Sequence, residues 1–125
     1  MISFDDLIGT PYTKEHDCNW LAATVAERMG QKFPENLETP DDQDTWAEKF
    51  RTILANHYRK IKEPFDGCIA IFAVPYLNGK IGWHCGTVIK PGWMITTRES
   101  ASVHICRINS PLWRVSLKGF YAYEK

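Results

Sequence analysis

The sequence predicts a single α+β domain in which N-terminal helices pack on an antiparallel sheet of about five strands. Apolar residues recur at helical spacing in the first half of the chain, whereas short apolar or alternating runs separated by turns fill the second half. No linker, repeat or low-complexity segment divides residues 1–125, and a chain of this length can bury a substantial core.

The first helix is expected to run from about residue 18 to 29. Asp17 is a favourable N-cap and Gly30 a favourable stop. Apolar residues then recur at three- and four-residue steps, at Leu21, Ala22, Val25, Ala26 and Met29.

A second helix is expected after a proline-containing loop over residues 30–40. Thr39-Pro40-Asp41-Asp42 combines a cap, a proline at the first position and acids in the first turn. Pro64 marks its end. The expected apolar stripe consists of Trp46, Phe50, Ile53, Leu54 and Tyr58.

Strands are expected from Pro64 onward. The turn Lys90-Pro91-Gly92 should join two antiparallel strands, with Ile89 near Trp93. A second turn is expected over residues 76–80. The expected strands are residues 68–74, 84–89, 93–98 and 102–108, with one or two more from residues 113–117 and 120–123.

Charge and hydropathy exclude several classes of protein. Fifteen Lys and Arg balance fifteen Asp and Glu, so overall charge gives no support for nucleic-acid binding. No apolar run reaches the roughly 18 residues that a bilayer-spanning helix needs, so we expect no membrane insertion. The acidic N-terminus lacks a signal-peptide pattern, and the four cysteines are therefore expected to be free thiols of a reducing compartment.

Cys18 is the candidate nucleophile of the chain. In the first turn of a helix, unpaired backbone N–H groups and the helix dipole favour an anion, and this lowers the pKa of a thiol. A thiolate becomes a catalyst when the fold brings a histidine beside it. His84, in Gly82-Trp83-His84-Cys85-Gly86, is the best candidate for this base.

The remaining cysteines and histidines are interpreted as structural or as alternatives. Cys68, Cys85 and Cys106 lie in apolar strand runs and are expected to be core residues. His104 shares a strand face with Cys106 and is an alternative partner for His84. The pairs formed by Cys18, Cys85 and Cys106 with neighbouring histidines lack the spacing of zinc sites, so we predict no metal and no cofactor.

Four motifs in order resemble the NlpC-type cell-wall peptidases, nearest to the compact versions of phage tail gene clusters. They are Gly9-Thr10-Pro11-Tyr12, Asp17-Cys18, Phe65-Asp66-Gly67-Cys68 with the apolar run after it, and His84-Cys85-Gly86-Thr87. The resemblance spans about residues 7–120. It implies a papain-like fold and hydrolysis of the γ-D-glutamyl–diamino-acid bond of peptidoglycan stem peptides.

The resemblance also implies roles for individual residues. Cys18 would be the nucleophile and His84 the base, with Tyr12 beside the thiolate and Asp17 binding the free amine of the stem peptide. The third catalytic position, twelve residues after the histidine, is Thr96. We expect its hydroxyl to accept a hydrogen bond from His84 Nδ1–H. The chain departs from the family here, where His, Asn or Gln is usual, and at Asn19-Trp20, where Ser-Gly is usual.

The resemblance finally implies a setting. The protein would be made in the bacterial cytoplasm without a signal peptide, become part of a virion tail, contact other tail-tip proteins, and act in the cell wall. The alternative is a non-catalytic tail-tip or tail-assembly protein that keeps the peptidase fold.

Overall fold

The computed structural model describes residues 3–13, 15–31, 52, 55–75, 81–98 and 101–123. The expected loop from residue 32 onward, most of the second helix with Trp46 and Phe50, and the turn over residues 76–80 lie outside the described residues. The described elements are α1 (Cys18–Arg28), β1 (Tyr58–Ile61), β2 (Ile69–Pro75), β3 (Ile81–Lys90), β4 (Trp93–Arg98), β5 (Ala101–Arg107), α3 (Pro111–Ser116) and β6 (Leu117–Tyr123).

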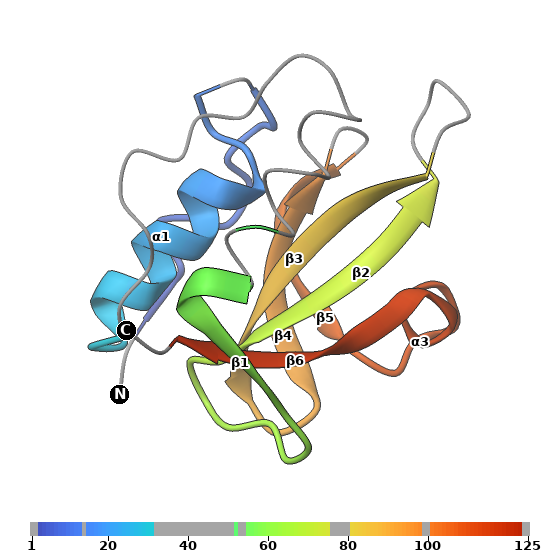
Figure 1. Cartoon of the computed structure of the whole chain (residues 1–125). Coiled ribbons are helices and arrows are strands. Elements are labelled where there is room, and N and C mark those ends of the chain that lie inside the picture. The colour runs from blue at the N-terminus through green and yellow to red at the C-terminus, as the bar shows by residue number, and fades with distance from the viewer. Residues whose placement is uncertain are drawn as a thin grey trace.

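The architecture is α+β, as the sequence predicts. The described strands form one sheet in the order β1-β6-β2-β3-β4-β5, and every neighbouring pair is antiparallel. Helix α1 packs on β3 and β4, and α3 contacts β2 (Figure 1). The sheet has six described strands where about five were expected, because β1 arises from a segment with helical periodicity.

Strand β1 corrects the predicted extent of the second helix. The helix stripe was expected to include Tyr58, but Tyr58 begins β1 and pairs with Tyr123 of β6. The two tyrosine rings meet edge to face at 5.5 Å, which is a favourable geometry for an aromatic pair. Pairing with β6 therefore overrides the local helical pattern in this segment.

Helix α3 corrects the interpretation of residues 113–117 as a strand. Ser110 has an extended backbone, Pro111 occupies the first turn, and Arg114 N–H donates to the Ser110 carbonyl at 2.8 Å. Trp113 and Ser116, one turn apart, are the buried residues of this helix. This short helix thus carries Trp113 inward before β6 begins.

The register between β3 and β4 differs by one residue from the prediction. Lys90, and not Ile89, lies opposite Trp93, because a bulge falls between Val88 and Lys90. The turn itself contains Gly92 at a φ of 82°, a conformation that favours glycine. Beyond the bulge, Thr87 pairs with Ile95, which brings the end of β4 toward the middle of β3.

The core beneath α1 joins the helix, the N-terminal segment and strands β4 and β5. Leu21 and Val25 of α1 pack with Ile95, Val103, Phe4 and Leu7. Gly9 N–H donates to the Val103 carbonyl at 2.9 Å, and Val103 N–H donates to the Thr10 carbonyl at 2.9 Å. Burying one such aliphatic side chain stabilises a fold by about 1.5–3 kcal/mol, so this cluster anchors the start of α1 on the sheet.

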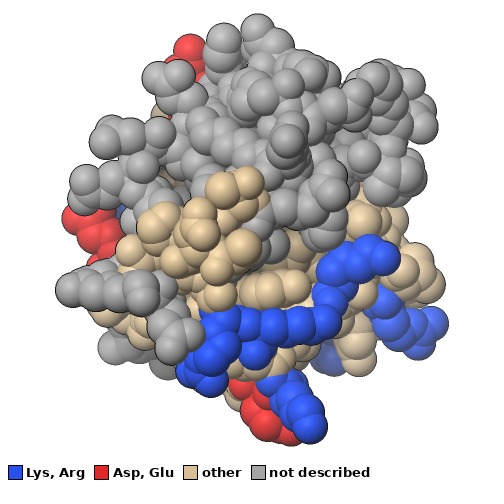
Figure 2. Space-filling model, viewed as in Figure 1, with Lys and Arg blue, Asp and Glu red and all other residues tan. Residues whose placement is uncertain are grey.

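The zero net charge of the chain conceals a local cluster of basic residues. Figure 2 shows Lys and Arg side chains gathered in the lower half of one face. Arg59 and Lys60 on β1 and Lys118 on β6 are exposed. No described helix is long and apolar enough to cross a membrane.

Candidate active site

Cys18 is the first residue of α1, where the sequence placed it. The Asp17 carboxylate accepts hydrogen bonds from the backbone N–H groups of Asn19 at 3.0 Å and Trp20 at 2.9 Å. These bonds satisfy two of the unpaired donors of the helix terminus and fix its first turn. The predicted N-cap is therefore confirmed, and the Cys18 side chain projects from the positive end of the helix dipole.

His84 lies on β3 and is held by Thr96 of β4. Nε2 of His84 is 2.6 Å from Oγ1 of Thr96, and both side chains are buried. The Thr96 hydroxyl donates its only proton to the Cys85 carbonyl at 3.0 Å. The hydroxyl oxygen must then accept a proton from His84, which places that proton on Nε2.

This tautomer corrects one detail of the sequence interpretation. The hydrogen bond to Thr96 was expected from Nδ1 of His84, but the structure uses Nε2. With its proton on Nε2, the neutral ring keeps a lone pair on Nδ1, and this atom is the one that can accept the proton of Cys18. The predicted contact between Thr96 and His84 is confirmed, whereas the catalytic role of Thr96 stays a prediction.

His104, the alternative partner of His84, is engaged elsewhere. It lies opposite Thr96 in the β4–β5 ladder. Its Nδ1 is 2.7 Å from the backbone carbonyl oxygen of Ser102, to which it donates. Thr96, and not His104, is therefore the described residue that accepts a hydrogen bond from the His84 ring.

The Cys18 thiol is acidic in this environment. A hydrogen bond from the Cys85 thiol lowers the pKa of Cys18 to about 5, against the opposing effect of burial. A hydrogen bond with His84, and the positive charge that this ring gains when it takes the Cys18 proton, act in the same direction as Cys85. The nearby Asp17 carboxylate acts in the opposite direction, but it is the weakest of these influences. Cys18 is thus a thiolate at neutral pH, and the two residues predicted to form the dyad interact.

Cys85 is a member of the site that the sequence did not reveal. It was expected to be a core residue, and it is buried, but it also contacts Cys18. Its Sγ lies 3.7 Å from the Cys18 backbone oxygen. The single Cys85 proton thus has two acceptors on Cys18, and the ionised Sγ is the stronger of the two.

Trp113 is the second residue that the sequence did not connect with the site. Its ring stacks on that of His84, with centroids 5.2 Å apart and planes 16° apart. Phe72 packs against Trp113 at 4.8 Å, and the Arg98 guanidinium lies 5.7 Å from the Trp113 ring. Trp113 is 4% exposed, so the indole shields one face of the imidazole from water.

The two predicted substrate residues lie on either side of a short loop. Tyr12 is half-buried ahead of α1, and Asp17 is buried at the helix start. Between them, His16 N–H donates to Thr13 Oγ1 at 2.9 Å and Thr13 N–H donates to the His16 carbonyl at 3.3 Å. Asp17 acts as the helix cap; its role toward substrate and that of Tyr12 stay predictions.

The cysteines and histidines do not assemble into a metal centre in the part of the chain that the structure describes. No three His, Cys, Asp or Glu residues there are placed to hold a metal ion. All four cysteines are free thiols.

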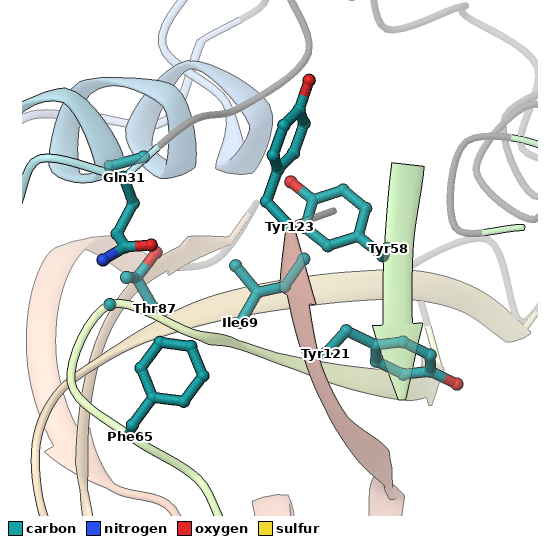
Figure 3. Close-up of a pocket in the computed structure, with 9 residues that line it drawn as sticks. Gln31, Tyr58, Phe65, Ile69, Thr87, Tyr121 and Tyr123 are labelled. Atoms are coloured by element: carbon teal, nitrogen blue, oxygen red, sulfur yellow. The ribbon is translucent and has the colours of Figure 1, made fainter. Parts of the chain in front are cut away.

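A pocket lies between the end of α1 and the sheet, next to the cluster that contains Cys18 and Cys85. Figure 3 shows Tyr58, Tyr121 and Tyr123 grouped around Ile69. The hollow has about 280 Å³ of empty space, part of it open to solvent. Its further lining residues are Ala26, Gln31, Phe65, Gly67 and Thr87. Ala26 and Gln31 belong to the end of α1 and the residues after it. On its other side the pocket borders the thiol site, because Ile69 packs in one cluster with Cys18 and Cys85.

Thiol hydrolases use an arrangement of three parts. These are a thiol at a helix N-terminus, a histidine on an adjacent sheet, and a residue that fixes the histidine tautomer. The chain is similar to a solved structure, determined at 1.79 Å, described as an NlpC/P60 family protein from Bacillus cereus ATCC 10987. The TM-score is 0.60 at 21% sequence identity.

The likeness to this structure concerns the fold. It covers 93% of the present chain but only 36% of the other chain, so this chain spans about a third of the length of that protein. A scan against protein families finds no match to the sequence, and a search of curated proteins finds none.

Proposed function

We propose that this protein is a cysteine peptidase that hydrolyses the γ-D-glutamyl–diamino-acid bond of peptidoglycan stem peptides. The observation that carries the proposal is the acidic Cys18 thiol beside His84, whose ring is fixed by Thr96. The shared fold with an NlpC/P60 protein supports the choice of substrate.

The reaction begins at the thiolate. His84 Nδ1 holds the proton that Cys18 has lost, and the thiolate attacks the γ-carbonyl carbon of D-glutamate. The Cys18 backbone N–H and the Tyr12 hydroxyl stabilise the tetrahedral oxyanion. Losing one such donor typically slows a reaction on the order of a hundredfold.

The second half of the reaction reverses the roles. Protonated His84 donates to the departing amine of the diamino acid, leaving a thioester on Cys18. Water, deprotonated by His84, then hydrolyses the thioester and frees the thiol. The Asp17 carboxylate, which caps α1, binds the free ammonium group of the stem peptide.

We propose further that the protein is made in the bacterial cytoplasm, is carried by a phage or prophage tail beside other tail-tip proteins, and opens the cell wall during infection. The resemblance of the sequence to the compact versions of phage tail gene clusters supports this setting. Mass spectrometry of purified virions tests it, since a tail component must appear at a fixed ratio to known tail proteins.

Incubation with defined muropeptides tests the activity. Liquid chromatography with mass detection should show addition of one water and release of a diamino-acid fragment. Cys18→Ala is the matched control and should give no product. If neither the wild-type protein nor the variant turns over any muropeptide, the protein is instead a tail-tip or assembly protein that retains the fold.

A further inference from the structure

Cys18 and Cys85 place two thiols side by side at the start of α1. Sγ of Cys85 lies 3.7 Å from the Cys18 backbone oxygen, and both side chains pack in one apolar cluster with Ala22, Ile69 and Ile71. The exposed fractions are 7% for Cys18 and 2% for Cys85. The proposed hydrolysis uses Cys18 but gives no covalent role to Cys85.

The sheet sets Cys85 in this position. Cys85 pairs with Ile71 across β2 and β3, and Ile71 belongs to the same cluster beneath Cys18. The other two cysteines are placed differently. Cys68 and Cys106 belong to a separate cluster around Phe72 and Trp113, so neither of them joins Cys18 in its cluster. The chain therefore contains one close pair of thiols and two internal controls.

We propose that Cys18 and Cys85 form a reversible redox modification site, in which Cys85 resolves the oxidised nucleophile into an intramolecular disulfide. The oxidant is a peroxide. The Cys18 thiolate attacks a peroxide oxygen, the O–O bond breaks, hydroxide leaves, and Cys18 becomes a sulfenic acid. Cys85 sulfur then attacks Cys18 sulfur, the S–O bond breaks, and the oxygen leaves as water with the Cys85 proton. Two thiols and one peroxide thus give one disulfide and two waters.

The electrostatics of the pair suit these two steps. The low pKa of Cys18 supplies the thiolate that reacts with peroxide. The pKa of Cys85 is raised because its proton is held by the Cys18 sulfur, because it is buried, and because of the Cys18 charge. Oxidation of Cys18 to the sulfenic acid removes that negative charge, and Cys85 then loses its proton more readily.

The disulfide would protect the nucleophile. A sulfenic acid without a nearby thiol is oxidised further to sulfinic and sulfonic acids, which thiol reductants do not reverse. A Cys18–Cys85 disulfide blocks Cys18 but is restored by reduction. The loss of hydrolysis on oxidation rests on the proposed function, whereas formation of the disulfide rests on the geometry alone.

Peptide mapping after peroxide treatment tests the proposal. The reduced protein is treated with a molar excess of hydrogen peroxide, because each step from thiol to sulfenic, sulfinic and sulfonic acid consumes one peroxide, and is then alkylated and digested without reductant. We expect a peptide that links Cys18 to Cys85, a mass loss of two hydrogen atoms, and full recovery with dithiothreitol. Cys85→Ser should instead accumulate sulfinic and sulfonic acid on Cys18. Cys68→Ser and Cys106→Ser should behave as the wild-type protein.

Other outcomes overturn the proposal. These are irreversible oxidation of wild-type Cys18 without the linked peptide, a disulfide to Cys68 or Cys106 instead, or a Cys85→Ser variant that oxidises as the wild type does. Because the mapping needs no substrate, a linked peptide without muropeptide hydrolysis would remove the proposed function and leave the redox site standing.

Discussion

The hydroxyl of Thr96 offers the sharpest test of how His84 is held. Thr96→Val keeps the shape of the side chain but replaces the hydroxyl with a methyl group. The change removes the acceptor 2.6 Å from His84 Nε2 and the donor 3.0 Å from the Cys85 carbonyl. Both groups lose their partner in a site where Thr96 itself is 0% exposed.

The magnitude follows from burial. A buried polar group that loses its hydrogen bond costs about 1–3 kcal/mol. If losing the tautomer and orientation of the His84 ring raises the activation barrier by this amount, kcat/KM on muropeptides should fall about 5- to 150-fold. Thr96→Ser is the matched control because it keeps the hydroxyl. It should lose about 1 kcal/mol of stability for the missing methyl group but hold kcat/KM close to the wild-type value.

The assay compares kcat/KM for the three proteins, each corrected for its folded fraction by circular dichroism. Equal kcat/KM for Thr96→Val and the wild type would refute the role of the hydroxyl. Equal losses in Thr96→Val and Thr96→Ser would show that packing, and not the hydrogen bond to His84, sets the rate.

The remaining predictions concern three other residues of the site. Cys18→Ala should abolish muropeptide hydrolysis in the chromatographic assay, while leaving the far-ultraviolet circular dichroism unchanged. Trp113→Ala should lower kcat by admitting water to the His84 ring, and it should alter the His84 imidazole resonances measured by NMR. Trp113→Phe should recover part of the kcat and part of the original resonances. Unchanged resonances in Trp113→Ala would exclude the stacking role. Asp17→Ala should destabilise the fold by about 1 kcal/mol in urea unfolding, and Asp17→Asn should not. A raised KM in Asp17→Asn without lost stability would separate amine binding from helix capping.

The elements that the sequence predicts correctly carry strong local signals. Asp17 and Gly30 bracket a run of apolar residues at helical spacing, and α1 follows this pattern. Counting back from the turn at Gly92 places Thr96 near His84, even though a bulge shifts the pairing by one residue. Caps, turns and periodicity are sufficient to predict these segments because no distant contact opposes the local preference.

The features that the sequence leaves open depend on distant contacts. Tyr58 fits a helical stripe, but the energy of pairing with β6 is visible only when the strand order is known. In the sequence, Cys85 is one of several residues in an apolar strand, and nothing local sets it apart. Its contact with Cys18 depends on how α1 packs on the sheet. The choice of Nε2 over Nδ1 on His84 depends on the approach direction of Thr96, which periodicity does not encode.

The most direct measurement is a titration of the Cys18 thiolate by its ultraviolet absorbance, taken as the difference between the wild-type protein and Cys18→Ala. A thiolate forms as pH rises through the pKa of the group, so a lowered pKa moves this step to more acid pH. The structure predicts a step at about pH 5 in the wild-type protein. A step near the ordinary cysteine value of about 8.5 would contradict an activated nucleophile at the start of α1.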